Sequence, residues 1–324
     1  MSVTILFWPP WRRGQEEWAR RVDEALPDVR TLSPEDTESA LDVIGEADAI
    51  FAESRISEEA LAAATKVRWI HSAMVAPPPG WYHDALIEHP ATVTNPRGVY
   101  NDHISVHIMS FVLHFARQLH RYVRSMAGAR WEPDLSRGGV TYLEEATALL
   151  IGVGEIGAET ARLLAAFGAT VVGVDARRSE LIEGLAELHP PEALDELLPR
   201  ADFVILTVPH TPETEGMMNA ARFGAMKDTA YLVNIGRGPT VRLDDLNEAL
   251  REGRIGGAGL DVYEIEPLPQ EHPLWSAPNV LLTPHVAAHG PYVEERRFQV
   301  LLENCRRFAA GEPLENTVDK ARWF

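Results

Sequence analysis

The sequence predicts an α/β protein with parallel β-sheets, and three observations lead to this fold class. Short runs rich in β-branched and aromatic residues alternate with helical stretches through the first hundred residues. A second series of the same kind begins at Ala146. The 324 residues, 45% of them apolar, suffice for two domains of ordinary size. Alternation of this kind is typical of parallel strands joined through helices.

The first series contains predicted strands at residues 3–8, 49–52, 68–71 and 92–94, and predicted helices at residues 15–26 and 57–65. Residues 77–80, which read Pro-Pro-Pro-Gly, follow the third strand. Because proline lacks an amide hydrogen and restricts the residue before it, this segment is predicted to form an extended loop.

Between the two series, residues 101–124 carry apolar side chains at spacings of three and four, which predicts one long helix bridging two domains. The second series then predicts a strand through Val153, a helix that begins at Glu155 and is closed by Gly168, and a strand at 170–175. Later predicted elements are strands at 203–208, 230–234, 257–261 and 280–282, a helix at 243–251 and a closing helix at 292–310.

Acidic residues outnumber basic ones by 48 to 30, so the formal net charge is −18. Such a charge repels nucleic acid and anionic membranes, and an anionic substrate would need a local cation. No apolar stretch approaches the roughly 18 residues that a membrane crossing requires, and the N-terminus lacks the pattern of a signal peptide. The single cysteine, Cys305, cannot form an internal disulfide, which favours a cytoplasmic location.

A glycine-rich turn in the segment LLIGVGEIGAETARLLAAFG predicts a dinucleotide site. Gly152 permits the tight turn, Gly154 lets the backbone approach a pyrophosphate, and Gly157 allows the helix to pack closely on the strand. The amides of Glu155 and Ile156 would then face the phosphates at the positive end of the helix.

The next strand ends at Asp175, near the expected spacing of about 20 residues after the turn. Its carboxylate would hold the adenosine ribose hydroxyls and repel a 2′-phosphate, so the predicted cofactor is NAD. Arg177 and Arg178 follow immediately and would accept that phosphate, so NADP stays open.

Polar residues at three later strand ends form a candidate catalytic set, within NIGRG, GLDVYEIEPLP and LLTPHVAAHG. Arg237 stands between two glycines and would grip a carboxylate or a carbonyl. His285 is the candidate proton donor for the alkoxide that hydride transfer produces. Glu266 or Asp261 would hold its imidazole in the charged form. Each residue alone is more commonly structural, but together they predict a reductase site.

His103 and His107 lie one helical turn apart, a spacing that suits a metal. Carboxylate and cysteine ligands are missing nearby in the sequence, so no metal site is predicted.

With these motifs, the sequence resembles the D-isomer-specific 2-hydroxyacid dehydrogenase family nearly end to end, including its glyoxylate/hydroxypyruvate reductases and phosphoglycerate dehydrogenases. Further matching segments are TNPRGVYNDHISVHIMSFVLHFAR and ADFVILTVPHTPETEGMMN. The resemblance implies that Arg237 binds substrate, that His285 donates the proton and that Glu266 is its partner. It also implies that Asp261 contacts the nicotinamide side, with Val208, Ile235 and Gly236 lining the nicotinamide ribose.

The resemblance further implies two Rossmann-like domains and a symmetric homodimer. A doubly wound cofactor domain, residues 99–289, would be inserted into a smaller, flavodoxin-like substrate domain, residues 1–98 and 290–324.

The loop expected to bind the substrate carboxylate departs from the family pattern. It comprises Ala73, Met74, Val75 and Ala76, and Met74 and Ala76 replace small glycines. A methionine there would narrow the pocket with a flexible apolar side chain, which disfavours phosphoglycerate. His289 also departs from the family pattern and has no assigned role.

The expected function is reduction of a small, anionic 2-oxo acid to its D-2-hydroxy acid with a nicotinamide cofactor. A formate-type dehydrogenase is disfavoured by Glu266, because those enzymes pair the histidine with glutamine. A non-catalytic NAD-sensing protein of the same fold remains the alternative.

Overall fold

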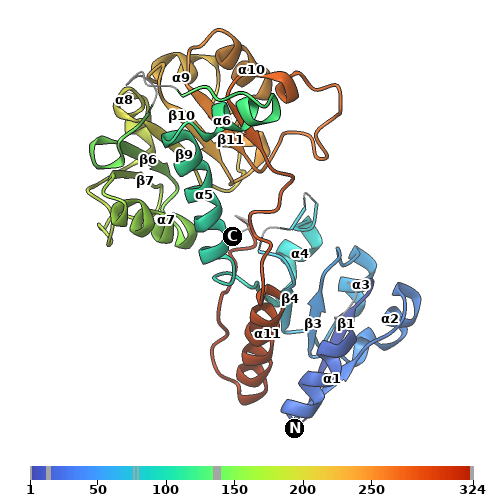
Figure 1. Cartoon of the computed structure of the whole chain (residues 1–324). Helices are drawn as coiled ribbons and strands as arrows, with labels where there is room; N and C mark the ends of the chain where they lie inside the picture. Colours follow the sequence, from blue (N-terminus) through green and yellow to red (C-terminus); the bar gives the residue numbers. More distant parts are fainter. Residues whose placement is uncertain (1, 12–15, 76, 79, 134–139, 322–324) are drawn as a thin grey trace. The chain divides into compact units, whose positions relative to one another are not determined.

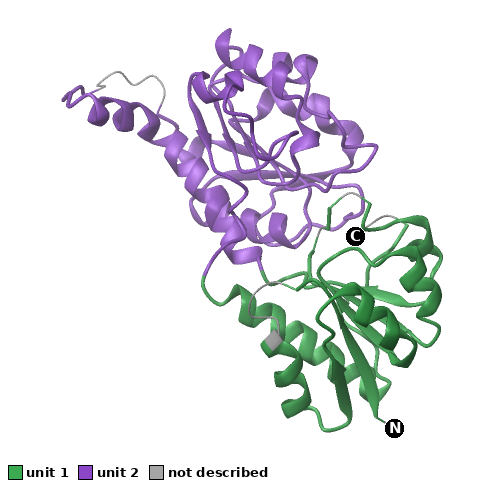
Figure 2. Cartoon of the chain, turned by 90° about the vertical axis from the view of Figure 1, so that its right-hand side faces the viewer, with its two compact units in different colours: residues 1–99, 291–324 green, residues 100–290 purple. Residues whose placement is uncertain are grey.

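The computed structural model describes residues 2–11, 16–75, 77–78, 80–133 and 140–321 (Figure 1). The chain divides into two compact units. Unit 1 comprises Met1–Val99 and Pro291–Phe324, and unit 2 comprises Tyr100–Gly290 (Figure 2). Unit 2 is therefore a continuous segment inserted into the sequence of unit 1.

Unit 1 is built on a five-stranded parallel sheet in the order β2-β1-β3-β4-β5, the order of flavodoxin-like folds. The strands are β1 (Val3–Trp8), β2 (Val29–Leu32), β3 (Ala49–Ala52), β4 (Trp69–Ser72) and β5 (Thr92–Thr94). The helices are α1 (Glu16–Ala25), α2 (Thr37–Val43), α3 (Glu58–Ala63), α4 (Asp84–Glu88) and α11 (Val293–Ala310), with a short 3-10 helix η1 (Ile44–Glu46).

Side chains of the strands alternate between two cores in unit 1, as a pleated strand requires. Ile5 and Phe7 of β1 lie in a core with α1 and α11, where Phe298 and Cys305 are buried. Leu6 and Trp8 lie in the opposite core with α2, α3 and α4. Helices on both faces explain why the strands are buried on both sides.

Unit 2 is built on a seven-stranded parallel sheet in the order β12-β11-β10-β9-β6-β7-β8. The strands are β6 (Thr147–Ile151), β7 (Thr170–Val174), β8 (Glu187–His189), β9 (Phe203–Leu206), β10 (Tyr231–Asn234), β11 (Gly257–Leu260) and β12 (Val280–Leu282). The strand order reverses between β6 and β9, and open α/β sheets bind ligands at such a switch point. The predicted α/β class with two parallel sheets is confirmed.

Helices cover both faces of this sheet. They are α5 (Asn101–Ala116), α6 (Leu119–Ala127), α7 (Glu155–Ala166), α8 (Leu194–Leu197), α9 (Ala220–Ala225) and α10 (Leu243–Arg251). Short 3-10 helices are η2 (Leu143–Glu145), η3 (Pro191–Ala193), η4 (Leu198–Arg200), η5 (Gly238–Thr240) and η6 (Pro273–Ser276). A Cβ atom added at Gly259 would lie 2.7 Å from the Phe111 ring, so α5 packs directly on β11.

The prediction of one long helix over residues 101–124 that bridges two domains was wrong. The helix ends at Ala116 and a second one begins at Leu119, and both lie wholly in unit 2. Gln118 adopts a left-handed conformation, φ 56°, and its buried amide donates hydrogen bonds to Tyr231 and Phe115. The cause of the break is therefore a tertiary contact that a local apolar pattern cannot reveal.

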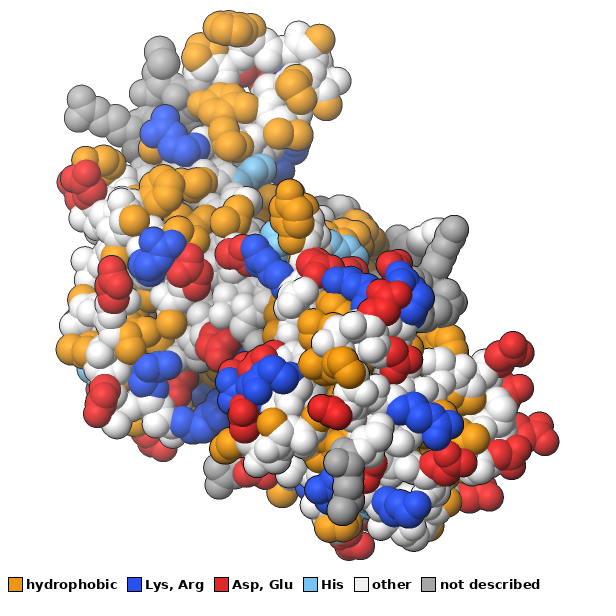
Figure 3. All heavy atoms as spheres, turned by 90° about the horizontal axis from the view of Figure 1, so that it is seen from below, with side chains coloured by type: hydrophobic (Ala, Val, Ile, Leu, Met, Phe, Trp, Pro, Cys, Tyr) orange, Lys and Arg blue, Asp and Glu red, His pale blue; other side chains and the backbone are white. Residues whose placement is uncertain are grey.

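The surface carries charged side chains of both signs. Figure 3 shows acidic and basic side chains intermixed on the face in view. Several acidic and basic side chains of the protein form ion pairs, such as Arg21 with Glu295 at 2.8 Å. In the described part of the chain, no helix has the length and apolar character needed to cross a membrane.

We predict that unit 1 loses stability as the pH falls below about 6.5, because His71 is buried in the neutral form. Burial, with a smaller contribution from the Arg297 charge, lowers the pKa of His71 from its ordinary value of 6.5 to about 3. As the pH falls between these values, the unfolded chain binds a proton that the folded chain does not. The resulting slope is at most about 1.4 kcal/mol per pH unit for this one group.

Urea unfolding of the wild type and of His71→Gln between pH 7 and pH 5 measures this effect. The glutamine cannot titrate but keeps groups that can bond to Thr94 Oγ1, which lies 2.8 Å from His71 Nδ1. The variant is expected to show a shallower loss of stability with falling pH. Equal slopes for the two proteins would contradict the prediction.

Candidate active site

The glycine-rich turn follows β6 at the switch point of the unit 2 sheet. Gly152 has φ 94°, which favours glycine, and a Cβ atom on Gly157 would lie 2.2 Å from the Gly152 carbonyl oxygen. A Cβ at Gly154 would meet no atom within 4 Å, so this part of the turn is open. No side chain caps the first turn of α7, which leaves its amides available for phosphate. The turn therefore fits a dinucleotide pyrophosphate.

Asp175 follows β7 and is held by backbone amides. One carboxylate oxygen accepts from the Val153 amide at 2.7 Å, and the other accepts from the Arg177 and Arg178 amides at 2.8 Å. Burial would raise the pKa of Asp175, but these three bonds hold it below its ordinary value. The side chain of Arg178 donates from Nε to the Val153 carbonyl, beside the same turn. A carboxylate and a guanidinium therefore both border the turn.

Arg237 lies in a turn after β10 that the buried Asn234 organises. Asn234 accepts from the Gly236 amide at 3.0 Å and donates to the Arg237 carbonyl at 3.1 Å. A Cβ atom on Gly238 would lie 1.8 Å from the Tyr263 carbonyl, so only glycine permits this close approach of the two segments. Burial lowers the pKa of Arg237 and the nearby Glu266 opposes that shift, but arginine remains charged in proteins.

His285 and Glu266 form a hydrogen-bonded pair. His285 Nδ1 lies 2.7 Å from Glu266 Oε2, and the other carboxylate oxygen accepts from the Tyr263 amide at 2.9 Å. The second ring nitrogen of His285, Nε2, is therefore the one left to face a substrate. His285 is about half exposed, so the imidazole is accessible.

Asp261 supports the segment that carries His285. Its carboxylate accepts from the amides of Val286 and Ala287 at 2.9 Å and from the Thr283 hydroxyl at 2.6 Å. Since that hydroxyl donates to Asp261, its oxygen accepts from His107 Nε2 at 3.0 Å. Asp261 is 1% exposed, and both of its oxygens are occupied.

Of the two carboxylates considered from sequence, Glu266 contacts the imidazole and Asp261 holds the following backbone. His285 itself has φ 54°, a conformation that non-glycine residues rarely adopt. The hydrogen bonds from Val286 and Ala287 to Asp261 hold the backbone after His285, and this position imposes the positive φ of His285. Sequence reasoning missed the supporting side chains of His107, Asn234 and Thr283, although Thr283 directly precedes the Pro284-His285 pair.

The remaining residues predicted near the cofactor lie at the same sheet edge. Val208 follows β9, and a Cβ atom on Gly152 would meet its side chain at 2.9 Å. Ile235 is buried directly after β10, and a Cβ atom on Gly236 would lie 2.6 Å from the Val208 carbonyl. These close approaches bring the ends of β6, β9 and β10 together.

The loop after β4 belongs to unit 1 and is fixed by hydrogen bonds. The Ala73 amide donates to the Ala52 carbonyl at 2.9 Å, which continues the sheet. The Met74 amide donates to Ser72 Oγ at 3.2 Å. The Val75 carbonyl accepts from Asn95 Nδ2 at 3.1 Å. Ala76, the fourth predicted residue of this loop, lies outside the described residues.

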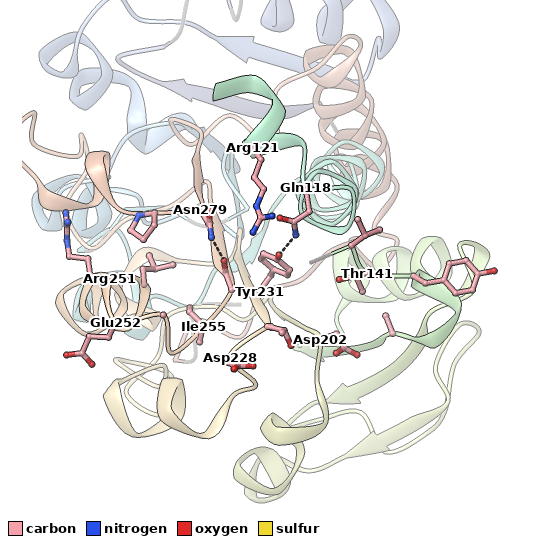
Figure 4. A pocket seen from close by; sticks show the side chains of 18 of the residues that line it. Gln118, Arg121, Thr141, Asp202, Asp228, Tyr231, Arg251, Glu252, Ile255 and Asn279 are labelled. Atoms are coloured by element: carbon pink, nitrogen blue, oxygen red, sulfur yellow. Dashed lines mark hydrogen bonds between the residues drawn. The ribbon is translucent and has the colours of Figure 1, made fainter. Parts of the chain in front are cut away.

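A pocket in unit 2 lies at the opposite edge of the sheet (Figure 4). Its lining includes Asp202, Thr229, Gly256 and Asn279, each of which directly precedes a strand or nearly does so. Tyr231, at the start of β10, also lines it, whereas Arg237 follows the end of that strand. The pocket is therefore separate from the candidate catalytic residues.

Among the described residues, no group of three or more histidine, cysteine, aspartate or glutamate side chains is arranged to hold a metal. The ring of His103 lies close to Gly290, and His107 bonds to Thr283. The two histidines thus have different surroundings despite their helical spacing.

Comparison with known proteins agrees with this geometry. A family model described as D-isomer specific 2-hydroxyacid dehydrogenase, NAD binding domain, matches residues 109–287. A glyoxylate reductase of Thermofilum pendens is 34% identical over 230 residues, which cover 70% of this chain and 68% of that protein.

Two solved structures align with this chain over 100% of its length and over 100% of their own length. One is a D-isomer specific 2-hydroxyacid dehydrogenase from Xanthobacter autotrophicus Py2 in complex with NADPH and MES, with a TM-score of 0.86 and 28% identity. The other is an NADPH-dependent glyoxylate/hydroxypyruvate reductase from Sinorhizobium meliloti in complex with NADP and sulfate, with a TM-score of 0.81 and 27% identity.

We predict that Asp261→Asn destabilises the segment that carries His285. The asparagine amide nitrogen would face a backbone N–H or a hydroxyl donor in place of a carboxylate oxygen, which leaves a buried donor unsatisfied. The expected loss is about 1–3 kcal/mol of unfolding free energy, measured by urea denaturation. Hydrogen exchange of residues 283–289 should also accelerate. Asp228→Asn, which neutralises an exposed carboxylate of the same unit, is the control. Equal stability and exchange in the two variants would refute this role.

Proposed function

Because the chain belongs to the D-isomer specific 2-hydroxyacid dehydrogenase family, we propose that it reduces small 2-oxo acids, with glyoxylate and hydroxypyruvate as the first candidates, to D-2-hydroxy acids. The family membership confirms the resemblance inferred from the sequence and makes the chain an NAD(P)-dependent oxidoreductase. The observation that carries the proposal is the hydrogen-bonded pair of His285 and Glu266 at the sheet edge that also bears Arg237 and the glycine turn.

In this proposal, His285 is the proton donor. A nicotinamide held in unit 2 would supply the hydride for C2 of the 2-oxo acid, which leaves the carbonyl electron pair on oxygen. His285 Nε2 protonates that oxygen, because Nδ1 is already bonded to Glu266. Glu266 stabilises the charged imidazole and fixes its orientation. The product is a 2-hydroxy acid, and His285 regains its proton from water.

Arg237 is proposed as the substrate-binding cation. Its planar guanidinium can donate two parallel hydrogen bonds to a carboxylate or reach the carbonyl oxygen. This supplies the local positive charge that an acidic protein needs to hold an anion. Asn234 and Gly238 hold the turn that contains Arg237, so the backbone that carries the guanidinium is fixed in position.

The cofactor is NAD(P), and Asp175 and Arg178 are proposed to decide between the two forms. The Asp175 carboxylate favours NADH because its charge repels a 2′-phosphate. Arg178 and the exposed Arg177 would attract that phosphate, and both solved relatives contain the phosphorylated cofactor. We expect NADH to be preferred and NADPH to be accepted.

The turn after β6 is proposed to hold the pyrophosphate of the cofactor, through Gly152, Gly154, Glu155, Ile156 and Gly157. The residues proposed to lie toward the nicotinamide are Val208, Ile235, Gly236 and Asp261.

Unit 1 is proposed to bind the substrate carboxylate through the loop after β4. The Ala73 and Met74 amides already donate within the protein, whereas the Val75 amide donates to no acceptor among the described residues. Val75 is therefore the proposed donor, and the Met74 side chain would restrict substrates to small ones. Unit 2 is correspondingly proposed as the cofactor domain.

If the protein were instead a non-catalytic NAD-binding sensor, it would bind the cofactor without turning over any 2-oxo acid. A sensor requires cofactor binding but no proton donor, whereas His285 and Glu266 form the pair that a proton donor requires. Glu266 also argues against a formate-type enzyme, whose reaction needs no proton delivered to an oxygen.

We predict that purified protein oxidises NADH with glyoxylate or hydroxypyruvate. His285→Ala should lower kcat by about 100-fold or more, because general acid catalysis typically contributes 10²–10⁴-fold. Arg237→Ala should mainly raise KM for the 2-oxo acid, and NADH affinity should stay within a factor of three in both variants. Repeating the assay with NADPH ranks the cofactors.

The matched control is His289→Ala, since that exposed histidine lies four residues beyond His285 and no catalytic role is proposed for it. Tight NADH binding without turnover on any 2-oxo acid would favour the sensor. Full activity of His285→Ala would remove that residue as the donor.

A homodimer is proposed through α6, which lies in an arm extending from the body of unit 2 (Figure 2). Large apolar side chains are exposed on α6 and on the residues that follow it, and they define the α6 apolar surface. They are Leu119, Tyr122, Val123, Met126, Trp131, Val140 and Tyr142. Exposed apolar patches of this kind mark protein interfaces, and a twofold dimer buries the same patch on both copies.

We predict a gel-filtration mass near twice the 36.0 kDa of one chain. Replacing Val123 and Met126 together by aspartate should give a monomer with an unchanged circular dichroism spectrum, because charge on both copies would be desolvated at the interface. Leu181→Asp, at an exposed leucine outside the α6 apolar surface, should leave the dimer intact. A wild-type mass near one chain would exclude the dimer.

A further inference from the structure

Arg297 is a buried arginine of unit 1 for which the proposed catalytic steps have no role. It lies on α11 and is 4% exposed. Its Nη2 donates to the Ala73 carbonyl at 2.6 Å and lies 3.3 Å from Glu53 Oε2, and its Nη1 lies 2.7 Å from Glu294 Oε1. Burying a guanidinium is costly unless its donors are satisfied, so these contacts form a specific arrangement.

Two of the partners of Arg297 follow neighbouring strands. Glu53 directly follows β3 and Ala73 directly follows β4, and the two strands pair in parallel. The arginine therefore joins two strand ends at the carboxyl edge of the unit 1 sheet. Ala73 begins the loop to which the proposed function assigns the substrate carboxylate.

Three successive carbonyls of this loop accept hydrogen bonds from side chains. The Ala73 carbonyl accepts from Arg297 at 2.6 Å, the Met74 carbonyl from Ser72 Oγ at 2.8 Å and the Val75 carbonyl from Asn95 Nδ2 at 3.1 Å. Of the three donors, only Arg297 carries a charge. Hydrogen bonds from charged donors are roughly twice as strong as those between neutral groups.

A carbonyl and the amide that follows it share one planar trans peptide, so they point in opposite directions. Holding the Ala73 carbonyl thereby sets the direction of the Met74 amide, which reaches Ser72 Oγ. Ser72 in turn holds the Met74 carbonyl, which sets the direction of the Val75 amide. The bond from Arg297 is thus the first of a series that orients the amide proposed to bind substrate.

We propose that Arg297 is a positioning residue that orients the Ala73–Val75 loop so that the Val75 amide binds the carboxylate of the 2-oxo acid. The inference rests on the proposed function and deepens it, because it identifies what fixes the substrate-binding loop. Arg297 acts through the backbone and does not itself touch the substrate.

An arginine suits this position because several acceptors lie around it. The planar fork of a guanidinium serves the Ala73 carbonyl, Glu53 and Glu294 at once, whereas a lysine ammonium is a single point charge. Glu53 has a side chain only 9% exposed and compensates the buried charge. Lysine at position 297 is therefore expected to keep the ion pair with Glu53 and to lose the bond to Ala73.

The first test is Arg297→Lys assayed with glyoxylate and with its methyl ester, which lacks the carboxylate. KM for glyoxylate should rise roughly ten-fold or more, the effect of one lost charged hydrogen bond. The kcat/KM for the ester should change less than three-fold, and NADH affinity should be unchanged. A role in stability alone would lower the activity on both substrates in parallel.

Two further variants complete the design. Arg306→Lys changes an exposed arginine of the same helix, which bonds to Glu303 and Glu312, and should leave both substrates unaffected. If Arg297→Lys fails to fold, Arg297→Gln combined with Glu53→Gln avoids an unpaired buried charge and should show the same selective loss for glyoxylate.

Hydrogen exchange of the Met74 and Val75 amides provides a readout that needs no turnover. It should accelerate in Arg297→Lys relative to Arg306→Lys in the absence of substrate. If the wild type reduces no 2-oxo acid, the proposed function fails while the exchange result still tests the loop anchor. If the wild type is active and the variant changes neither the preference for acid over ester nor the exchange rates, the positioning role is overturned.

Discussion

The arrangement of the candidate catalytic residues depends on the hydrogen bonds that the buried Asp261 carboxylate accepts. Three donors of the segment after β12 converge on this group, which follows the neighbouring strand β11. They tie the two strand ends together and hold His285 at a positive φ. Because an unpaired buried carboxylate is costly, the backbone stays where all three bonds form. From that backbone position His285 Nδ1 reaches Glu266 Oε2.

The loop after β4 in unit 1 is also held by a buried charged side chain, but there the charge is positive. There the buried Arg297 guanidinium reaches a backbone carbonyl and a carboxylate that follow adjacent strands. In both units, a charged group inaccessible to water fixes a short segment at the carboxyl edge of a parallel sheet. A fixed backbone is what precise placement of a catalytic or binding group requires, since reacting groups must be aligned before reaction. The strands therefore supply the positions and the buried charges supply the rigidity.

Much of the fold could be predicted because it depends on local patterns. Most strands lie where runs of β-branched and aromatic residues lie, and the glycine turn after β6 has the conformation that its steric role requires. The short strands β2 and β8 were not predicted, because their sequences, Val-Arg-Thr-Leu and Glu-Leu-His, do not form a run of β-branched and aromatic residues. The break between α5 and α6 was missed since it depends on the contact of Gln118 with Tyr231, far away in the sequence.

The sequence by itself determined the α/β class, the order of the strands along the chain, the glycine turn and the identity of the polar residues at strand ends. These features depend on side-chain periodicity and on backbone sterics, which act between near neighbours. Only the tertiary structure showed the contact of Glu266 with the imidazole, the support of Thr283 by His107 and the bond of Arg297 to Ala73. Those contacts join residues distant in the sequence, because parallel strands bring their carboxyl ends together whatever the length of chain between them.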